Sequence, residues 1–284
     1  MILDAILILG GVGVVFAVLI AIAYRKLKVV DDPRIDVVAG MLPNANCGAC
    51  GLPGCRAFAE QVVAGTIQPV KCTVSSENGV VAIANFLGVD RGTAVRRVAR
   101  LQCGGGTNVA VQQAEYRGLS TCAAAAAVAG GGKGCAWGCL GLADCEAVCD
   151  FDAIQMNEFH LPVVDPDKCT ACGDCLEACP KDLFVLQPVT HHLLVQCRNL
   201  VAGDEVLEQC QVACTACGRC VQDSAAGLIN VSTGLAVIDY SRIQEEEARA
   251  ISRCPTNSIV WLEGMQFAAV RAANASPAHR SAVA

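Results

Sequence analysis

The sequence predicts an α+β protein: an apolar N-terminal helix, a small helical domain, and then a series of short cysteine-rich repeats. Three observations support this fold class. Residues 5–23 form a stretch of 19 residues without a charge. The chain holds 20 cysteines among its 284 residues, and most of them lie in closely spaced runs. The strand-like segments 161–165 and 235–239 have similar sequences and lie roughly 70 residues apart, which indicates an internal repeat.

The composition excludes some classes of protein and narrows the compartment. A formal net charge of -6 argues against a nucleic-acid-binding surface, which needs clustered Lys and Arg. Aromatic residues make up only 4% of the chain, so we expect no large conventional core. In a secreted protein 20 cysteines would indicate disulfides, whereas in the reducing cytoplasm the same number indicates bound metal. The spacing of the cysteines decides between these two possibilities.

The first apolar segment is long enough to cross a membrane. As a helix its 19 residues would extend about 28 Å, close to the thickness of the hydrocarbon core. Three basic residues follow within residues 25–28 and only Asp4 precedes the segment, so the positive-inside rule places the C-terminal part in the cytoplasm. The alternative is a cleaved signal peptide, because residues 21–23 (AIA) resemble a cleavage site. Since no Lys or Arg precedes the segment, we expect a transmembrane anchor over residues 1–24.

Local signals predict the elements that follow the anchor. Asp32 and Pro33 suit the N-cap and first position of a helix that ends near Leu42. Further helices are expected over residues 56–64, 81–101 and 122–129. The predicted regions are an N-terminal cysteine-rich domain (25–80), a helical connecting region (81–134), a two-site cysteine domain (135–196), a degenerate copy of it (197–265) and a tail (266–284).

The most specific motif is the run Cys169-x2-Cys172-x2-Cys175-x3-Cys179-Pro180. This spacing is typical of bacterial ferredoxins, in which three thiolates bind one [4Fe–4S] cluster and the fourth ligates a second cluster. Zinc is the alternative, but zinc sites rarely use four cysteines packed in this way. The run therefore predicts a bacterial-ferredoxin-like fold with [4Fe–4S] clusters.

A second run lies just upstream, with looser spacing and with Asp150 where the ferredoxin run has a proline. Exchanging the fourth ligand between the two runs, as ferredoxins do, predicts two clusters. One would be held by Cys135, Cys139, Cys145 and Cys179, and the other by Cys149, Cys169, Cys172 and Cys175.

The last unit repeats this pattern in incomplete form. Asp223 and Ser224 occupy the place of a Cys-Pro pair, and Ile243 lies where a further cysteine run would begin. A two-cluster unit that loses one cluster loses four ligands together, so the remaining cysteines make one complete site. Its predicted ligands are Cys214, Cys217, Cys220 and Cys254.

The N-terminal domain carries another compact run. Within NCGACGLPGC, residues 46–55, the glycines let the backbone bend tightly around an inorganic cluster. A [4Fe–4S] site is predicted here, with zinc as the alternative. The predicted ligands are Cys47, Cys50, Cys55 and Cys72.

Four cysteines remain after these assignments, and two interpretations stay open for them. A free buried cysteine behaves as a small apolar residue. Four is also the number that a fifth cluster would need, so a tentative fifth site is predicted. Its cysteines would be Cys103, Cys122, Cys197 and Cys210.

Other chemistry finds no support in the sequence. The histidines show no ligand spacing and are interpreted as surface or loop residues: His160, His191, His192 and His279. The glycine-rich segment 130–134 lacks the Ser or Thr that follows the lysine of a phosphate loop. No catalytic triad, paired-carboxylate site or dinucleotide fingerprint is present, so we expect no catalytic residues and no complete catalytic site in this chain alone.

Taken together, the motifs resemble the B subunit of the Rnf complex, in its longer form, over about residues 1–262. The segments that carry the resemblance are DDP (31–33), NCGACGLPGC (46–55), CAWGCLGLADC (135–145), DKCTACGDCLEACP (167–180) and LAVIDY (235–240). The four leftover cysteines also match positions in that longer form, which implies that they are ligands. The chain departs from the pattern at Asp150 and in the last unit, which leaves the number of clusters open.

The resemblance implies an electron-transfer subunit of a membrane-bound ferredoxin:NAD oxidoreductase that translocates Na⁺ or H⁺. Ferredoxin would be the electron donor, and other membrane and flavin-bearing subunits would be the partners. The chain would lie at the bacterial inner membrane, with its iron–sulfur domains on the cytoplasmic side. Two alternatives are an iron–sulfur redox sensor and an iron–sulfur subunit of a soluble oxidoreductase; no output module or substrate domain is evident for either.

Overall fold

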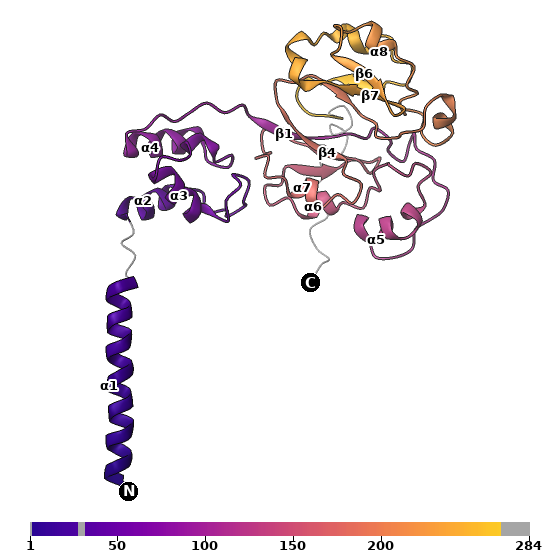
Figure 1. Ribbon diagram of the computed structural model, residues 1–284. Coiled ribbons are helices and arrows are strands. Elements are labelled where there is room, and N and C mark those ends of the chain that lie inside the picture. The colour runs from indigo at the N-terminus through magenta and orange to yellow at the C-terminus, as the bar shows by residue number, and fades with distance from the viewer. Residues whose placement is uncertain (1, 28–31, 268–284) are drawn as a thin grey trace. The chain divides into compact units, whose positions relative to one another are not determined.

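The computed structural model describes residues 2–27 and 32–267, and the side chains of residues 2–9 and 25–27 are left out of the description (Figure 1). The chain divides into two compact units. The first comprises residues 1–46, 52–69 and 76–91, and the second comprises residues 47–51, 70–75 and 92–284. Each unit is described by itself below.

The first unit is helical. Its helices are α1 (Ile2–Leu27), α2 (Pro33–Met41), α3 (Cys55–Val63) and α4 (Glu77–Leu87), and the 3-10 turn η1 (Pro69–Lys71) precedes α4. Asp32 caps α2 by accepting a hydrogen bond from the Arg34 amide at 2.9 Å. The helices predicted over 33–42 and 56–64 are therefore confirmed.

The apolar N-terminal segment is helical, and its described side chains are largely exposed, with Val14 at 64%, Phe16 at 61% and Ile20 at 67%. Over the residues that the structure describes, no helix combines the length and the hydropathy needed to span a membrane.

The helix predicted over residues 81–101 is wrong in its second half. α4 ends at Leu87, because Gly88 adopts the left-handed conformation (φ 66°) that closes many helices. Residues 97–101 form the strand β1 (Arg97–Leu101) instead, in which the last four residues are all buried. A continuous buried run of this length fits a strand covered on both faces better than a one-sided helix.

The second unit is built from short strands and turns. Its strands are β1, β2 (Ile154–Met156), β3 (Pro162–Val164), β4 (Phe184–Pro188), β5 (Leu193–Val195), β6 (Ile229–Ser232), β7 (Leu235–Ile238) and β8 (Ile259–Trp261). Its helices are α5 (Cys122–Ala127), α6 (Asp144–Ala147), α7 (Asp174–Glu177) and α8 (Arg219–Gln222). Its 3-10 turns are η2 (Ala129–Gly132), η3 (Asp204–Glu208), η4 (Tyr240–Glu245) and η5 (Ala248–Ile251).

The strands pair in antiparallel twos, and two of these pairs repeat one another. In the described residues the pairs are β1–β4, β2–β3, β5–β8 and β6–β7. β2–β3 and β6–β7 are hairpins between successive strands, whereas β1 and β4 join segments far apart in the sequence (Figure 1). The strands β3 and β7 confirm the strand-like segments expected at 161–165 and 235–239, and α5 confirms the alanine-rich helix.

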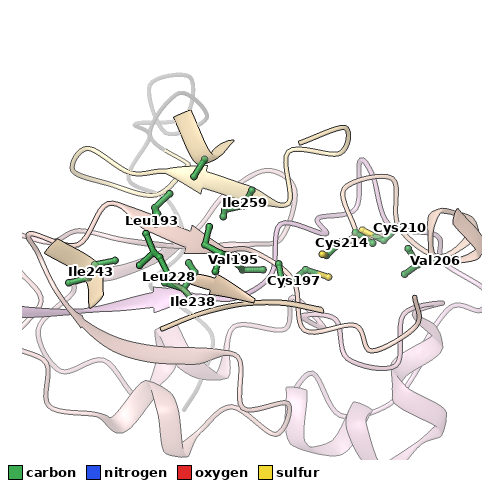
Figure 2. Close-up of a cluster of buried hydrophobic side chains, with 14 of the residues drawn as sticks. Leu193, Val195, Cys197, Val206, Cys210, Cys214, Leu228, Ile238, Ile243 and Ile259 are labelled. Carbon is green, nitrogen blue, oxygen red and sulfur yellow. The ribbon is translucent and has the colours of Figure 1, made fainter. Parts of the chain in front are cut away.

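Two apolar cores hold these pairs together, and cysteines belong to both. Figure 2 shows the first, where Leu193, Val195 and Leu228 pack together and the sulfur atoms of Cys197 and Cys210 lie toward one end. The second core lies around β1, β3 and β4, and includes Cys103, Cys145 and Cys175. Cysteines in a core are positions where an inorganic group can complete the packing.

The first residue of the predicted tail, Gln266, belongs to the folded part of the chain. Gln266 is 1% exposed, and its side-chain amide exchanges two hydrogen bonds with the backbone of Leu101, at 2.8 and 3.0 Å. It thereby satisfies backbone groups at the end of β1. The rest of the predicted tail, residues 268–284, lies outside the described residues.

Candidate iron–sulfur sites

Four cavities in the second unit are each lined by four cysteines. They enclose similar volumes, about 320 to 340 Å³ including some space open to solvent. We name each by one cysteine. The Cys172 cavity is lined by Cys149, Cys169, Cys172 and Cys175; the Cys139 cavity by Cys122, Cys139, Cys145 and Cys179; the Cys103 cavity by Cys103, Cys135, Cys197 and Cys210; and the Cys217 cavity by Cys214, Cys217, Cys220 and Cys254.

Two of these sets have the composition expected from the sequence, the Cys172 and Cys217 cavities. The other two differ from expectation by an exchange: Cys122 stands with Cys139, Cys145 and Cys179, and Cys135 stands with the leftover cysteines. The cysteines that line these two cavities thus differ in one member each from the predicted ligand sets, which stay predictions.

The contacts of the two exchanged cysteines explain their places. The Cys122 and Ala123 amides donate to the Asp144 carboxylate at 2.9 and 3.1 Å, which ties the start of α5 to the start of α6, beside Cys145. The Cys135 sulfur accepts a hydrogen bond from Asn199 Nδ2 at 3.4 Å, next to Cys197 in the chain. Both are long-range contacts, so the spacing of a single run could not reveal them.

Burial makes these thiols hard to ionise unless something offsets the charge. Desolvation raises the pKa of Cys139 to about 12 and that of Cys175 to about 12. It also raises the pKa of Cys197 and that of Cys220, each to about 11. At Cys254 burial acts in the same direction, but hydrogen bonds from the Ile259 amide and neighbouring hydroxyls outweigh it and lower the pKa.

These features suit a multinuclear cluster. The donors are all sulfur, and a bound cation favours the thiolate form that burial disfavours. Sulfurs on one zinc ion lie about 2.3 Å from it, so four of them converge on a point. In the described residues no three His, Cys, Asp or Glu side chains are grouped closely enough for a single ion. Each cavity is lined by four cysteines, and cysteine-bound [4Fe–4S] clusters take four thiolates.

Hydrogen bonds and close neighbours link the cavities in one order. Cys145 of the Cys139 cavity lies near enough to Cys175 of the Cys172 cavity for the Cys175 charge to help raise the pKa of Cys145. The Cys139 amide donates to the Cys103 sulfur at 3.4 Å. The Cys214 amide donates to the Cys197 sulfur. The four cavities therefore follow one another in the order Cys172 cavity, Cys139 cavity, Cys103 cavity and Cys217 cavity.

The backbone comes unusually close to the sulfurs at one glycine. A Cβ at Gly105 would lie 3.0 Å from the Cys210 sulfur and 3.6 Å from the Cys103 sulfur. Any larger residue would therefore displace a sulfur that lines the Cys103 cavity.

The Cys103 cavity also has side chains that the motifs do not single out. Lys133 and Asn199 both line it. Lys133 lies near enough to Cys135 and Cys210 for its charge to oppose the rise in their pKa values, which burial causes. No spacing pattern identifies these residues, because each belongs to the site through the fold alone.

The cysteines of the N-terminal run are divided between the two units, so their grouping stays a prediction. Local contacts are consistent with a tight turn there. The Cys55 amide donates to Asn46 Oδ1 at 2.9 Å, and Ser75 Oγ donates to the Cys72 sulfur at 3.3 Å. A Cβ at Gly54 would lie 2.9 Å from Asn46 Oδ1, so this turn requires glycine.

Two of the histidines are not simple surface residues. His192 Nδ1 lies 2.7 Å from the Glu246 carboxylate, and its ring stacks on Trp261 at 4.7 Å. His191 stacks on Tyr240 at 5.7 Å. Both lie in the loop before β5, as expected, and are half-buried; their contacts are structural ones around β5 and β8.

Small antiparallel hairpins with four-cysteine cavities define this chain as a ferredoxin-like iron–sulfur protein. The family model described as "Putative Fe-S cluster" matches residues 42–74, and the model described as "4Fe-4S binding domain" matches residues 161–184. The iron–sulfur cofactor predicted from the cysteine runs, the [4Fe–4S] cluster, is confirmed as a class.

Full-length relatives specify the family. The chain is 42% identical to the B subunit of the Na(+)-translocating ferredoxin:NAD(+) oxidoreductase complex of Acetobacterium woodii, over 89% of this chain and 75% of the relative. It is 33% identical to the B subunit of the ion-translocating oxidoreductase complex of Methanosarcina acetivorans, over 90% and 97%. It is 34% identical to the B subunit of the proton-translocating ferredoxin:NAD(+) oxidoreductase complex of Clostridium ljungdahlii, over 87% and 88%.

The chain belongs to the family of B subunits of ion-translocating ferredoxin:NAD oxidoreductase complexes. The resemblance stated from the motifs is confirmed, and so is the predicted role as an electron-transfer subunit of an oxidoreductase. These relatives do not favour the sensor or the soluble-oxidoreductase alternative. They are subunits of complexes, so this chain works with other subunits.

Proposed function

We propose that this chain carries single electrons from reduced ferredoxin to the membrane and flavin-bearing subunits of an ion-translocating oxidoreductase. The proposal rests on one observation above all: four four-cysteine cavities follow one another with hydrogen-bonded or neighbouring cysteines at each junction. A [4Fe–4S] cluster, when bound, supplies a one-electron couple. Hydride and ion chemistry then belong to the partner subunits.

We propose five cluster sites. Four are the cavities of the second unit, with the cysteines that line them as ligands. The fifth is the N-terminal set Cys47, Cys50, Cys55 and Cys72, supported by the family model that matches residues 42–74. The chain's own contribution is to hold the thiolates in fixed places, to exclude water from them and to donate hydrogen bonds to their sulfurs.

Metal analysis of the full chain, purified without oxygen, tests the number of sites. Five [4Fe–4S] clusters correspond to about 20 irons and as much acid-labile sulfide per chain, at four of each per cluster. About 16 irons would contradict the fifth site. Zinc in place of iron would contradict the electron-transfer role altogether.

Paired substitutions test the ligand grouping. Two cysteines of one site should together remove one cluster, whereas cysteines of different sites should remove two. We expect Cys122→Ala with Cys139→Ala to cost about four irons, and Cys135→Ala with Cys139→Ala to cost about eight, at four per cluster. The reverse result would restore the grouping expected from the run spacing alone.

We also propose that α1 anchors the chain in the bacterial inner membrane, with the cysteine domains on the cytoplasmic side. The charge-free composition of residues 5–23, the basic residues that follow, and the exposure of Phe16 and Ile20 support this. Phe16→Asp with Ile20→Asp should release the chain from membranes at alkaline pH, because a carboxylate in the hydrocarbon core is costly. Val37→Asp, at an exposed position of α2, is the matched control; retention of the double variant would contradict the anchor.

A further inference from the structure

The Cys103 cavity differs from its neighbour in the charge that lines it. Lys133 and Arg198 line the Cys103 cavity, and among the described residues no carboxylate does. The adjacent Cys139 cavity is lined by one residue of each sign, Asp144 and Lys181. The first cavity is therefore cationic, whereas the charges of the second balance.

Lys133 is the more effective of the two cations, because it is held in place. Its ammonium donates to the carbonyl oxygens of Gly105 and Cys139, each at 2.5 Å. Those carbonyls belong to Gly105, two residues after Cys103, and to Cys139 itself, so the charge also acts on Cys139. Of the four described cavities Lys133 lines only the Cys103 cavity, however, and the Cys139 cavity has the Asp144 carboxylate to offset positive charge. Arg198 is exposed and donates to Gln102 Oε1 at 2.9 Å, where water screens its charge.

N–H groups add to this effect by donating to sulfurs of the Cys103 cavity. The amides of Trp137, Cys214 and Val212 donate to Cys135, Cys197 and Cys210 in turn. Asn199 Nδ2 donates to the Cys135 sulfur, the Asn199 amide to the Cys197 sulfur and the Cys139 amide to the Cys103 sulfur, each at 3.4 Å. Asn199 is 1% exposed and is itself fixed, because its Oδ1 accepts from the Val201 amide at 2.9 Å and its Nδ2 also donates to Gln209 Oε1 at 3.0 Å.

Reduction of a cluster adds one negative charge to the site. A nearby cation and inward-pointing N–H groups stabilise the reduced form more than the oxidised form, and this raises the reduction potential. We propose that Lys133, with Asn199, makes the cluster in the Cys103 cavity higher in potential than the cluster in the adjacent Cys139 cavity. Lys133 and Asn199 are thus positioning residues that bias electrons toward the Cys103 cavity. This inference rests on the cluster sites proposed above.

The test is a redox titration of the full chain followed by electron paramagnetic resonance. Cys210→Ala, which removes the cluster of the Cys103 cavity, identifies the signal that belongs to it. In Lys133→Met the aliphatic stem remains and the charge is lost, so we expect that signal to titrate at lower potential by a tenfold change in the reduction equilibrium or more. Tenfold corresponds to about 59 mV for a one-electron couple. Lys133→Arg should restore the wild-type value.

Lys168→Met is the matched control, since Lys168 is exposed and lines none of the described four-cysteine cavities. It should leave the signal of the Cys103 cavity where it is. Asn199→Leu removes the side-chain donor to the Cys135 sulfur and should also lower the potential, by less than Lys133→Met. Asn230→Leu, at an exposed position of β6, is its control.

Three outcomes would decide the matter. A shift confined to the identified signal, with iron content unchanged, supports the inference. An unchanged midpoint potential in Lys133→Met, or a shift no larger than that of Lys168→Met, overturns it. If Lys133→Met loses four irons, the test rests on Asn199→Leu: a midpoint potential no lower than that of Asn230→Leu then overturns the inference. Loss of no iron in Cys210→Ala would instead overturn the proposed cluster site itself.

Discussion

Two seven-residue runs of this chain, 169–175 (CTACGDC) and 214–220 (CTACGRC), differ at one position only, where Asp174 of the first corresponds to Arg219 of the second. Their backbones agree as well. Ala171 and Ala216 both have a φ of 57°, a conformation that alanine seldom adopts. The same sequence therefore builds the same loop twice, around the Cys172 and Cys217 cavities.

The surroundings of the two runs differ far more than the runs do. The first run is followed closely by Cys179-Pro180, whereas Asp223 and Ser224 follow the second run in place of a Cys-Pro pair, and Cys254-Pro255 lies further along the chain. Ala250 is 1% exposed and belongs, like Ile243, to the apolar core of Figure 2. Apolar side chains thus fill the last cysteine repeat, residues 197–265, where the two-site domain, residues 135–196, has cysteines for another cluster.

A charged pair, Asp223 and Arg253, lies in the last cysteine repeat, residues 197–265. The Asp223 side chain is 7% exposed, and Arg253 donates to both of its oxygens at 2.7 Å, which holds the pKa of the carboxyl below its usual range. The comparison teaches that the cysteine run determines the loop, while residues outside the run determine the number of clusters around it.

The largest expected effect comes from removing one cysteine of each run. Cys172→Ala and Cys217→Ala should each remove one cluster, about four irons, because a cubane with three thiolates lacks a ligand. If the four cavities form one path, both variants should abolish ferredoxin-dependent NAD reduction in membranes that still contain the chain. Full activity in either variant would remove that cavity from the path, and the other variant is its control.

Exchanging the single charged residue that differs between the two runs should shift the reduction potentials of the two clusters in opposite directions. Asp174→Arg should raise the potential of the cluster in the Cys172 cavity, and Arg219→Asp should lower that of the cluster in the Cys217 cavity, each by a few-fold to tenfold in equilibrium constant, tenfold being about 59 mV. Asp174 and Arg219 line these cavities, and Arg100, buried near Cys169, is a further charge at the first site only. Redox titrations in which neither potential moves would show that these charges are fully screened.

Loss of the Asp223–Arg253 pair should lower the stability of the last cysteine repeat. Arg253→Met leaves the buried Asp223 carboxylate without its charge partner, which is destabilising. We expect a lower thermal midpoint for the second unit at neutral pH, followed by circular dichroism. Arg242→Met, which breaks an exposed pair with Glu245, should change the midpoint little. Equal effects of the two variants would mean that burial of Asp223 is unimportant.

The smallest effect is expected at the glycine that both runs share. Gly173 (φ 103°) and Gly218 (φ 72°) each precede a short helix, and alanine at such angles costs about 1–2 kcal/mol. Gly173→Ala and Gly218→Ala should lower stability to denaturant by similar amounts. Gly79→Ala, inside α4, should act in the opposite direction, since glycine within a helix is unfavourable. Unequal costs at the two loops would show that their conformations are less alike than φ suggests.

Much of the local structure was predictable, because its causes are local. Asp32 and Pro33 begin α2, the glycines after α3 and α4 end those helices, and the strand-like segment 161–165, similar to 235–239, predicts β3. The segment 97–101 was not predictable in this way. Its partner β4 lies more than 80 residues away, and only pairing with it makes β1 a strand.

The same distinction holds for the cysteines. Spacing within a run groups Cys169, Cys172 and Cys175, which follow one another around a single loop and line one cavity. It could not place Cys122 or Cys135, because their neighbours depend on contacts with Asp144 and Asn199 from other parts of the chain. The place of Lys133 in the Cys103 cavity could not be predicted for the same reason.

The exposure of one cysteine has a consequence for handling the protein in air. Cys217 is exposed, whereas all four cysteines that line the Cys103 cavity are buried. Oxidation follows thiolate character and access, so oxygen should reach the Cys217 cavity first and the Cys103 cavity last. A sample damaged in this way would lose one cluster selectively and contain about 16 irons, at four per cluster. It would then look like an intact protein with one cluster fewer, and only a time course of iron loss in air would tell the two apart.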